Sequence, residues 1–340
     1  MDNPILVEVM RGDFVESVHR GAISIVDASG AVLVDIGDTH KPIFPRSAIK
    51  PLQALYLAES GAVEKYGLSD EELALACSSH NGEQAHAAGI VIMLGKAGLT
   101  YECLECGSQW PVLPADRGAL IKADQKPDAR HNNCSGKHAG FICATHHLGE
   151  KIEGYVKPEH PAQRELKGIL EVLTGYDIKD PATIATDGCS IPTYALPLKN
   201  LAHAFARFAA ASDMGTGRDK AARDIHNACT KHPYLIAGTK RFDTNVMELL
   251  GHKALIKTGA EGVYAGMIPS LGLGIALKCE DGTTRASEAM MAGALAAVFA
   301  EGRDLLAPYL ASTLKNRNGW AVGSVRVVDG LVKRLRQSVA

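Results

Sequence analysis

The chain has 340 residues, a hydrophobic fraction of 46%, a charged fraction of 22% and a formal net charge of −2. These values are close to those of ordinary globular proteins, so they exclude wholesale disorder and favour a chain that buries a sizeable core. A nucleic-acid-binding protein normally carries a basic stripe, which this sequence lacks, so we expect no nucleic-acid partner.

The N-terminal segment MDNPILVEVMRGDF has no basic start and no apolar run of signal-peptide length. No stretch approaches the roughly 18 apolar residues of a membrane span, so we expect a cytoplasmic protein without a membrane partner. Eight cysteines are spread through the chain. In that setting a disulfide framework is disfavoured, and reduced thiols, a metal site or core packing remain open.

The beginning of the chain shows the two-residue alternation of β-strands, at residues 6–9, 15–18, 22–26 and 32–34. Gly12-Asp13 and Ser29-Gly30 supply turn residues between these runs. The pattern predicts an antiparallel meander.

Residues 44–60 then change to helical spacing, and residues 69–235 are mainly helical with loops rich in Gly, Pro, Asn and His. The strand pattern returns at 254–257 and 274–278. Asp281-Gly282 indicates a hairpin turn into a short strand, followed by a helix from about Ser287 and a weak strand at 324–328.

This order predicts an α+β fold in which the N- and C-terminal segments form one antiparallel sheet flanked by helices. We expect helices 44–60 and 287–301 to pack on the sheet. The whole chain, 1–340, is expected to be a single catalytic unit. Its sheet-containing part is 1–65 with 240–340, and its mainly helical insertion is 66–239.

The first candidate for chemistry is Ser47-Ala48-Ile49-Lys50. Residues three apart share a helix face, which places an amine beside a hydroxyl. A serine is a poor nucleophile unless a neighbour takes its proton, and a lysine can do so if burial or nearby cations lower its pKa. Alone the motif is weak, because S-x-x-K is common by chance.

Two further motifs follow in the chain: Ser78-Ser79-His80-Asn81 after a helical run, and Lys257-Thr258-Gly259 after a strand-like run. Each alone could be a polar turn or a strand-end lysine. S-x-x-K, Ser-x-Asn and K-T-G in this order are the motif set of penicillin-recognising serine acyltransferases. The middle motif lies closer to Lys50 than is usual for a β-lactamase, which favours a relative in architecture.

Cysteines 134 and 189 each lie in a polar segment, HNNCSGKHAG and TDGCSIP. Two thiolates and one nitrogen, from Lys137 or His138, would leave one open position on a tetrahedral zinc. Two small buried cysteines beside a polar turn would explain the same residues. The pair Cys103 and Cys106 lacks a partner pair at the usual spacing, so core packing is the simpler interpretation.

The segments PRSAIKPLQA, CSSHNGE, HNNCSGKHAGF, TDGCSIPTYALPL and KTGAEGVYA together resemble the class 3, rhizobial-type L-asparaginases. Five motifs agree in order over most of the chain. The resemblance implies a fold related to serine β-lactamases and glutaminases, a homodimer, and hydrolysis of L-asparagine to L-aspartate and ammonia.

The resemblance also implies roles for particular residues. It implies two serine–lysine pairs, Ser47 with Lys50 and Ser79 with Lys257, and a zinc site that affects substrate binding more than chemistry. The zinc ligands would be Cys134, Lys137 and Cys189. The residues expected to line the substrate pocket are Arg46, His80, Asn133, His138, Asp187 and Gly259.

We favour Ser47 as the nucleophile over Ser79, because Ser47 and its base are one turn apart on one element. Three alternatives stay open: a glutaminase or β-lactamase-like esterase on the same scaffold, a zinc-binding protein without catalysis, and a hydrolase that uses zinc-bound hydroxide. The last is weakened by the lack of an HExxH or three-histidine pattern.

Overall fold

The computed structural model describes residues 2–299 and 303–339, which form two compact units. The sheet unit comprises Met1–Ala48, Ala195–Ala210 and Ile256–Ala340, and the helical unit comprises Ile49–Tyr194 and Ala211–Leu255. Each unit contains its own part of the predicted chemistry.

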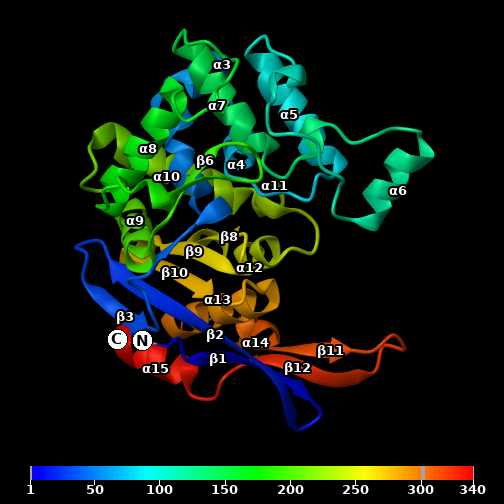
Figure 1. Cartoon of the computed structure of the whole chain (residues 1–340), viewed down its shortest axis with the longest axis vertical. Helices are drawn as coiled ribbons and strands as arrows, with labels where there is room; N and C mark the ends of the chain where they lie inside the picture. Colours follow the sequence, from blue (N-terminus) through cyan, green and yellow to red (C-terminus); the bar gives the residue numbers. More distant parts are fainter. Residues whose placement is uncertain (1, 300–302, 340) are drawn as a thin grey trace. The chain divides into compact units, whose positions relative to one another are not determined.

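The sheet unit is built on one large sheet, with the N-terminal and late strands side by side (Figure 1). Within the described residues it has eight strands in the order β11-β12-β1-β2-β10-β9-β8, and β3 pairs with β2. The pairs β1–β2, β1–β12, β2–β3, β2–β10, β9–β10 and β11–β12 are antiparallel. The strands are β1 (Ile5–Arg11), β2 (Phe14–Asp27), β3 (Val32–Ile36), β8 (Leu255–Gly259), β9 (Val263–Ile268), β10 (Leu273–Cys279), β11 (Ala311–Lys315) and β12 (Ala321–Val327).

This arrangement confirms the α+β class and the shared antiparallel sheet predicted from the sequence. The two short runs at 15–18 and 22–26 are one continuous strand, β2. The other elements of this unit are β4 (Pro42–Ile43) paired with β7 (Leu196–Pro197), the 3-10 turns η1 (Arg46–Ile49) and η6 (Pro269–Leu271), and the helices α9 (Leu198–Ala210), α13 (Thr284–Val298), α14 (Arg303–Leu310) and α15 (Leu331–Val339).

Helices cover the middle of the sheet on both faces. Alternate residues of a strand point to opposite faces. A Cβ added at Gly274 on β10 would meet the backbone of α9, whereas one added at Gly21, which pairs with Cys279, would meet Met290 of α13. Residues 21–26 of β2 are therefore all buried, as an element covered on both faces requires.

The helical unit contains the central part of the chain. Its α-helices are α1 (Lys50–Gln53), α2 (Leu55–Glu59), α3 (Ala62–Tyr66), α4 (Asp70–Ala76), α5 (Gln84–Lys96), α6 (Pro114–Lys122), α7 (Ser135–His147), α8 (Pro161–Thr174), α10 (Thr216–Lys231), α11 (Pro233–Ala237) and α12 (Phe242–Leu250). The 3-10 turns η2 (Tyr101–Cys103), η3 (Ala129–His131), η4 (Pro181–Thr183) and η5 (Gly251–Lys253) and the short pair β5 (Ile184–Thr186) and β6 (Pro192–Tyr194) complete it.

Helix α7 is the central helix of this unit and contacts α2, α4 and α5. Residues 135–145 are all buried, so the helix has no solvent-exposed face over three turns. Two of its glycines allow close packing, since a Cβ at Gly136 would lie 2.0 Å from the Leu75 carbonyl oxygen of α4. The first turn of α7, which carries Lys137 and His138, is therefore held rigidly against the end of α4.

Two local expectations differ from the structure. The predicted helix 44–60 begins as the 3-10 turn η1, and its later part, α1 and α2, belongs to the helical unit. The strand expected after Asp281-Gly282 is wrong: Asp281 accepts a hydrogen bond from the Thr283 amide, and helix α13 begins at Thr284. An aspartate that bonds two residues ahead starts a turn and favours a following helix.

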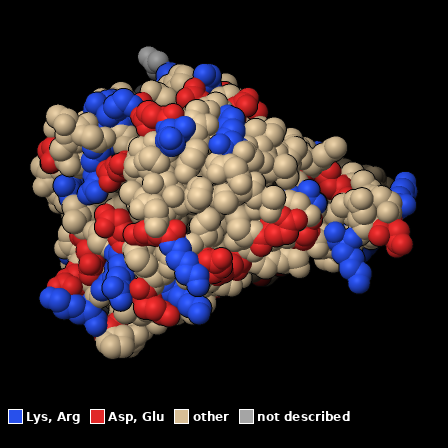
Figure 2. Space-filling view, turned by 90° about the horizontal axis from the view of Figure 1, so that it is seen from above, with Lys and Arg blue, Asp and Glu red and all other residues tan. Residues whose placement is uncertain are grey.

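The surface shown in Figure 2 carries both positive and negative side chains. In Figure 2, Lys and Arg side chains are interspersed with Asp and Glu over the face shown. No large patch of a single sign is visible there, in agreement with the net charge of −2.

Close packing at Gly274 predicts a large effect of a small substitution. The added Cβ of Gly274→Ala would lie 1.9 Å from the Ala202 oxygen, so α9 must shift. We expect a loss of about 1–3 kcal/mol in the free energy of unfolding, measured by urea denaturation. Gly168→Ala in α8 meets no atom within 4 Å and should keep or raise stability. Equal effects of the two substitutions would contradict this packing.

Candidate active site

The loop that follows α4 places Ser78 and Ser79 in the helical unit. Helix α4 begins with a capping box between Ser69 and Glu72 and ends at Cys77, so the two serines leave the helix directly. The loop is then fixed by backbone pairing, because the Ser79 amide donates to Ile236 O at 2.8 Å and the Asn81 amide donates to Ala237 O at 3.0 Å. Ser79 is 4% exposed.

Lys50, the first residue of α1, is aimed at this loop. Its side chain is 1% exposed, and Nζ donates to Ser79 Oγ at 2.8 Å, to the Ser78 carbonyl oxygen and to Asn133 O at 3.4 Å. Burial lowers the pKa of Lys50, and the neighbouring Lys137 adds to this, although the Cys134 and Cys189 sulfurs oppose it. A buried lysine with a lowered pKa is able to act as a base toward a serine hydroxyl.

The three residues expected to bind zinc converge in the same unit. Cys134 precedes α7, Lys137 lies in its first turn, Cys189 precedes β6, and their side chains are 4%, 2% and 3% exposed. Lys137 Nζ donates to Cys189 Sγ at 3.1 Å. A hydrogen bond from Cys189 and the nearby Lys50 and Lys137 lower the pKa of Cys134 well below its ordinary value.

This cluster fits a zinc ion by the chemistry of its donors. A thiolate, a second thiol and an amine meet in a buried place, and three protein donors are the number found in zinc sites that keep an open position. In the metal-free protein the two sulfurs raise the pKa of Lys137 despite its burial. Metal binding therefore requires the loss of a proton from Lys137.

The predicted pocket residues of the helical unit differ in whether their polar atoms already bind other protein groups. His80 accepts from the Gly82 amide through Nδ1 at 3.0 Å and meets Ser135 Oγ through Nε2 at 3.0 Å, so both ring nitrogens bind the protein. Burial lowers the pKa of His80 well below its ordinary value, which keeps the ring neutral. His80 therefore holds the serine loop against the start of α7.

Asn133, His138 and Asp187 lie around the same cluster. The backbone carbonyl oxygen of Asn133 accepts hydrogen bonds from Lys50 Nζ and from the His80 amide. His138 is fully buried, its Nδ1 meets Tyr155 Oη at 2.6 Å, and its Nε2 has no partner within the described residues. Asp187 is half-buried and accepts from the Gly188 amide at 2.8 Å.

The sheet unit contains the other predicted residues: Arg46, Ser47, Lys257 and Gly259. Arg46 has a φ of 52°, a left-handed conformation that is rare outside glycine and is found at strained functional positions. A Cβ at Gly259 would lie 2.5 Å from Pro45 O, so the end of β8 packs directly against the turn that carries Ser47. Lys257 is fully buried, and its Nζ donates to Thr258 O at 3.0 Å.

The expected pairs, Ser47 with Lys50 and Ser79 with Lys257, each have one member in either unit and stay predictions. The pair that the structure brings together is Lys50 with Ser79. Sequence spacing did not indicate it, because the two residues are 29 positions apart and only the packing of α1 against the loop after α4 joins them.

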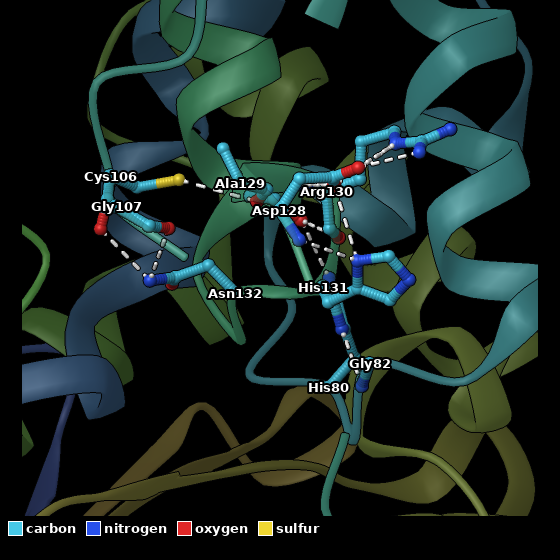
Figure 3. A network of polar contacts seen from close by, with 10 residues as sticks. His80, Gly82, Cys106, Gly107, Asp128, Ala129, Arg130, His131 and Asn132 are labelled. Atoms are coloured by element: carbon cyan, nitrogen blue, oxygen red, sulfur yellow. Dashed lines mark hydrogen bonds and ion pairs between the residues drawn. The ribbon is translucent and has the colours of Figure 1, made fainter. Parts of the chain in front are cut away.

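Several supporting residues were also missed. Figure 3 shows the segment before α7, where Arg130 and His131 both bind the Asp128 carboxylate. Asn132 Nδ2 donates to the carbonyl oxygens of Cys106 and Gly107, at 2.9 and 3.1 Å. These contacts fix the chain that leads into Asn133 and Cys134, and no short motif marks them.

The thiols of the C-x-x-C pair bind backbone oxygens. Cys103 donates to Thr100 O at 2.8 Å, and Cys106 donates to Ala129 O at 3.5 Å. Burial raises the pKa of Cys103 to about 11 and that of Cys106 to about 12, which disfavours redox chemistry.

One further cluster of His, Cys and Asp lies in the sheet unit, at His19, Cys279 and Asp281. Its contacts are those of a hydrogen-bonded cluster: the Cys279 thiol and His19 Nδ1 both meet the Asp281 carboxylate, and Arg285 Nε donates to His19 Nε2 at 3.2 Å. A cation beside the imidazole is unfavourable for a metal dication, so we interpret this group as structural.

A buried amine hydrogen-bonded to a serine hydroxyl is an arrangement typical of serine hydrolases. The family model of L-asparaginase II matches residues 7–327. The chain therefore belongs to the L-asparaginase II family, and its class is that of an amidohydrolase. This confirms the resemblance found in the motifs.

The search of the curated proteins gives no match. Among solved structures, two show weak similarity to this chain. One is a putative beta-lactamase from Bacteroides dorei DSM 17855, with 13% identity over 76% of this chain and 84% of that chain and a TM-score of 0.39. The other is D-alanine carboxypeptidase AmpC from Burkholderia cenocepacia, with 11% identity over 78% and 90% and a TM-score of 0.36.

None of the helices in the described residues has the length and apolar character needed to cross a bilayer.

The lowered pKa of Lys50 predicts a pH-dependent stability. Its pKa lies below the ordinary 10.5, so between the two values the unfolded chain holds a proton that the folded chain lacks. The free energy of unfolding should rise with pH across that window and be lowest on its acidic side. Lys50→Met should flatten this dependence, measured by urea denaturation at a series of pH values. Lys65→Met, at an exposed lysine, should not, and equal slopes would contradict the assignment.

Proposed function

We propose that this protein hydrolyses L-asparagine to L-aspartate and ammonia. The observation that carries the proposal is the Lys50 amine, 1% exposed and 2.8 Å from Ser79 Oγ. Burial lowers its pKa, so a neutral amine is available as a base at physiological pH more readily than in water. Membership of the L-asparaginase II family supports the same reaction.

Ser47 is proposed as the nucleophile. It is half-buried and thus reachable. It follows Arg46, whose left-handed backbone makes a sharp turn. Its oxygen would bond to the side-chain amide carbon of asparagine while its proton passes to Lys50, three residues further along the chain.

The remaining steps complete the reaction. The carbon–nitrogen bond breaks, ammonia leaves with a proton returned by the lysine, and water hydrolyses the aspartyl ester to release L-aspartate and restore Ser47. Backbone N–H groups near Ser47 would stabilise the oxyanion, an interaction worth about 3–4 kcal/mol per donor in other enzymes. Ser79, 4% exposed and bonded to Lys50, and the buried Lys257 are proposed to relay protons to the leaving ammonia or to hold the substrate.

We also propose that Cys134, Lys137 and Cys189 hold Zn²⁺. Bound there, the ion would offer one open coordination position and a positive charge that favours substrate binding. The chain's own residues retain the bond-breaking roles above. A homodimer and a cytoplasmic location, implied by the resemblance, remain proposals that light scattering and cell fractionation can test.

The activity test compares ammonia release from L-asparagine, L-glutamine and a chromogenic ester. We expect L-asparagine to be the preferred substrate. Ser47→Ala should lower kcat by about 10³-fold or more, because the nucleophile is lost while the fold is kept. Ser79→Ala should lower kcat less, since a relay can be replaced in part by water.

Two outcomes would contradict the assignment. If Ser79→Ala abolished turnover and Ser47→Ala did not, the roles of the two serines would be reversed. Preference for glutamine or the ester would show a different amidase or esterase on this scaffold.

The zinc proposal predicts about one Zn²⁺ per chain in tag-free protein, measured by elemental analysis. Cys134→Ser and Cys189→Ser should each abolish binding, whereas Cys106→Ser, a buried thiol bound to Ala129 O, should keep it. Because Lys137 must lose a proton, zinc affinity should fall as pH is lowered. Removal of the metal should raise KM more than it lowers kcat. Zinc that stays bound in the Cys134 and Cys189 variants would contradict this ligand set.

A further inference from the structure

Arg241 and Lys50 contact different atoms of Ser79. Lys50 Nζ meets the Ser79 hydroxyl, whereas Arg241 Nη1 approaches the Ser79 carbonyl oxygen at 3.5 Å and donates to Asn81 Oδ1 at 3.2 Å. All four residues belong to the helical unit. The Lys50 amine and the Arg241 guanidinium are thus held against one residue of the proposed catalytic machinery.

The position of Arg241 is fixed by the segment that precedes it. Glu83 accepts from the Thr239 amide and hydroxyl, both at 2.7 Å, and Asn81 Nδ2 donates to Thr239 O at 3.1 Å. Gly238 has a φ of 107°, and a Cβ there would lie 2.4 Å from Glu83 Oε1. The serine loop and the Arg241 segment are therefore locked together, and the guanidinium cannot easily move away from Ser79.

Within the described residues of the helical unit, the Arg241 guanidinium forms no ion pair with a carboxylate. Arg130, by contrast, binds Asp128 with paired hydrogen bonds. Both oxygens of the nearest carboxylate on this loop, Glu83, already accept hydrogen bonds from Thr239, Tyr234 and Asn81. The acceptors of Arg241 are two neutral oxygens, reached by one of its three nitrogens. A half-buried guanidinium in this state is suited to a planar anion.

Asparagine carries such an anion close to its amide group. Three C–C bonds join its α-carboxylate to its amide carbon, a span of roughly 4 Å, which is the size of one residue. Lys50 and Arg241 bind two oxygens of one residue, Ser79. We propose that Arg241 binds the α-carboxylate of the substrate and so selects amino-acid amides, an inference that rests on the proposed asparaginase function.

The test compares three amides that differ at one end: L-asparagine, succinamic acid, which lacks only the α-amino group, and β-alaninamide, which lacks only the α-carboxylate. Arg241→Met should lower kcat/KM for L-asparagine and succinamic acid by about 100-fold, mainly through KM. With β-alaninamide, a poor substrate, kcat/KM should change by less than about twofold, because that amide has no group for Arg241 to bind. Arg241→Lys should recover part of the loss, since it keeps the charge without the planar fork.

Lys240→Met is the matched control, because it removes the same charge from the exposed neighbouring residue. It should leave kcat/KM unchanged for all three amides. Equal losses on all three amides in Arg241→Met would overturn the proposal and leave Arg241 as a residue that only supports the serine loop.

A binding measurement separates this proposal from the asparaginase assignment. Calorimetric titration with L-aspartate should show at least tenfold weaker binding to Arg241→Met than to the unsubstituted protein. If the unsubstituted protein releases no ammonia from asparagine, the asparaginase proposal fails, and the titration alone decides the role of Arg241. Absence of L-aspartate binding, or binding unaffected by Arg241→Met, would overturn the carboxylate site.

Discussion

The Lys50 amine, enclosed by acceptors, is the feature on which the arrangement of the helical unit depends. An amine removed from water is unfavourable unless hydrogen-bonding partners surround it. Here the acceptors are the Ser78 and Asn133 carbonyl oxygens, the Ser79 hydroxyl and the Cys134 sulfur. They come from the end of α4 and the start of α7, so one side chain ties both elements to α1.

The hydrogen bonding of Lys50 explains how the serine–lysine pair and the cysteine–lysine donor set come to share one small region. The acceptors of Lys50 include Cys134, whose own neighbours are Cys189 and Lys137. A serine–lysine pair and a sulfur-rich donor set are thus adjacent through a common residue. A change in charge at one is felt at the other, because both are buried and charges are screened less there than in water. Arg241 completes the surroundings of Ser79 through the rigid contact between the segments around Asn81 and Thr239.

Prediction from sequence succeeded where short-range patterns carry the information. The two-residue alternation of 6–9 and 22–26 identified strands that do pair in one antiparallel sheet with the late strands. It missed β9 and β11, whose alternation is not visible because β9 is buried on both faces and β11 is mostly exposed. The hairpin expected at Asp281 failed because the aspartate side chain binds the backbone ahead of it and starts a helix.

The sequence by itself identified the candidate chemical groups of this protein: the serine–lysine motif at Ser47, the serine loop at Ser79, and the cysteines and lysine at 134, 137 and 189. It did so because each candidate residue lies in a short local motif. Only the tertiary structure decided that Lys50 meets Ser79 and that Arg241 is held beside the same serine. Those contacts join residues far apart in the chain, and they arise from the packing of buried helices, which no local spacing encodes.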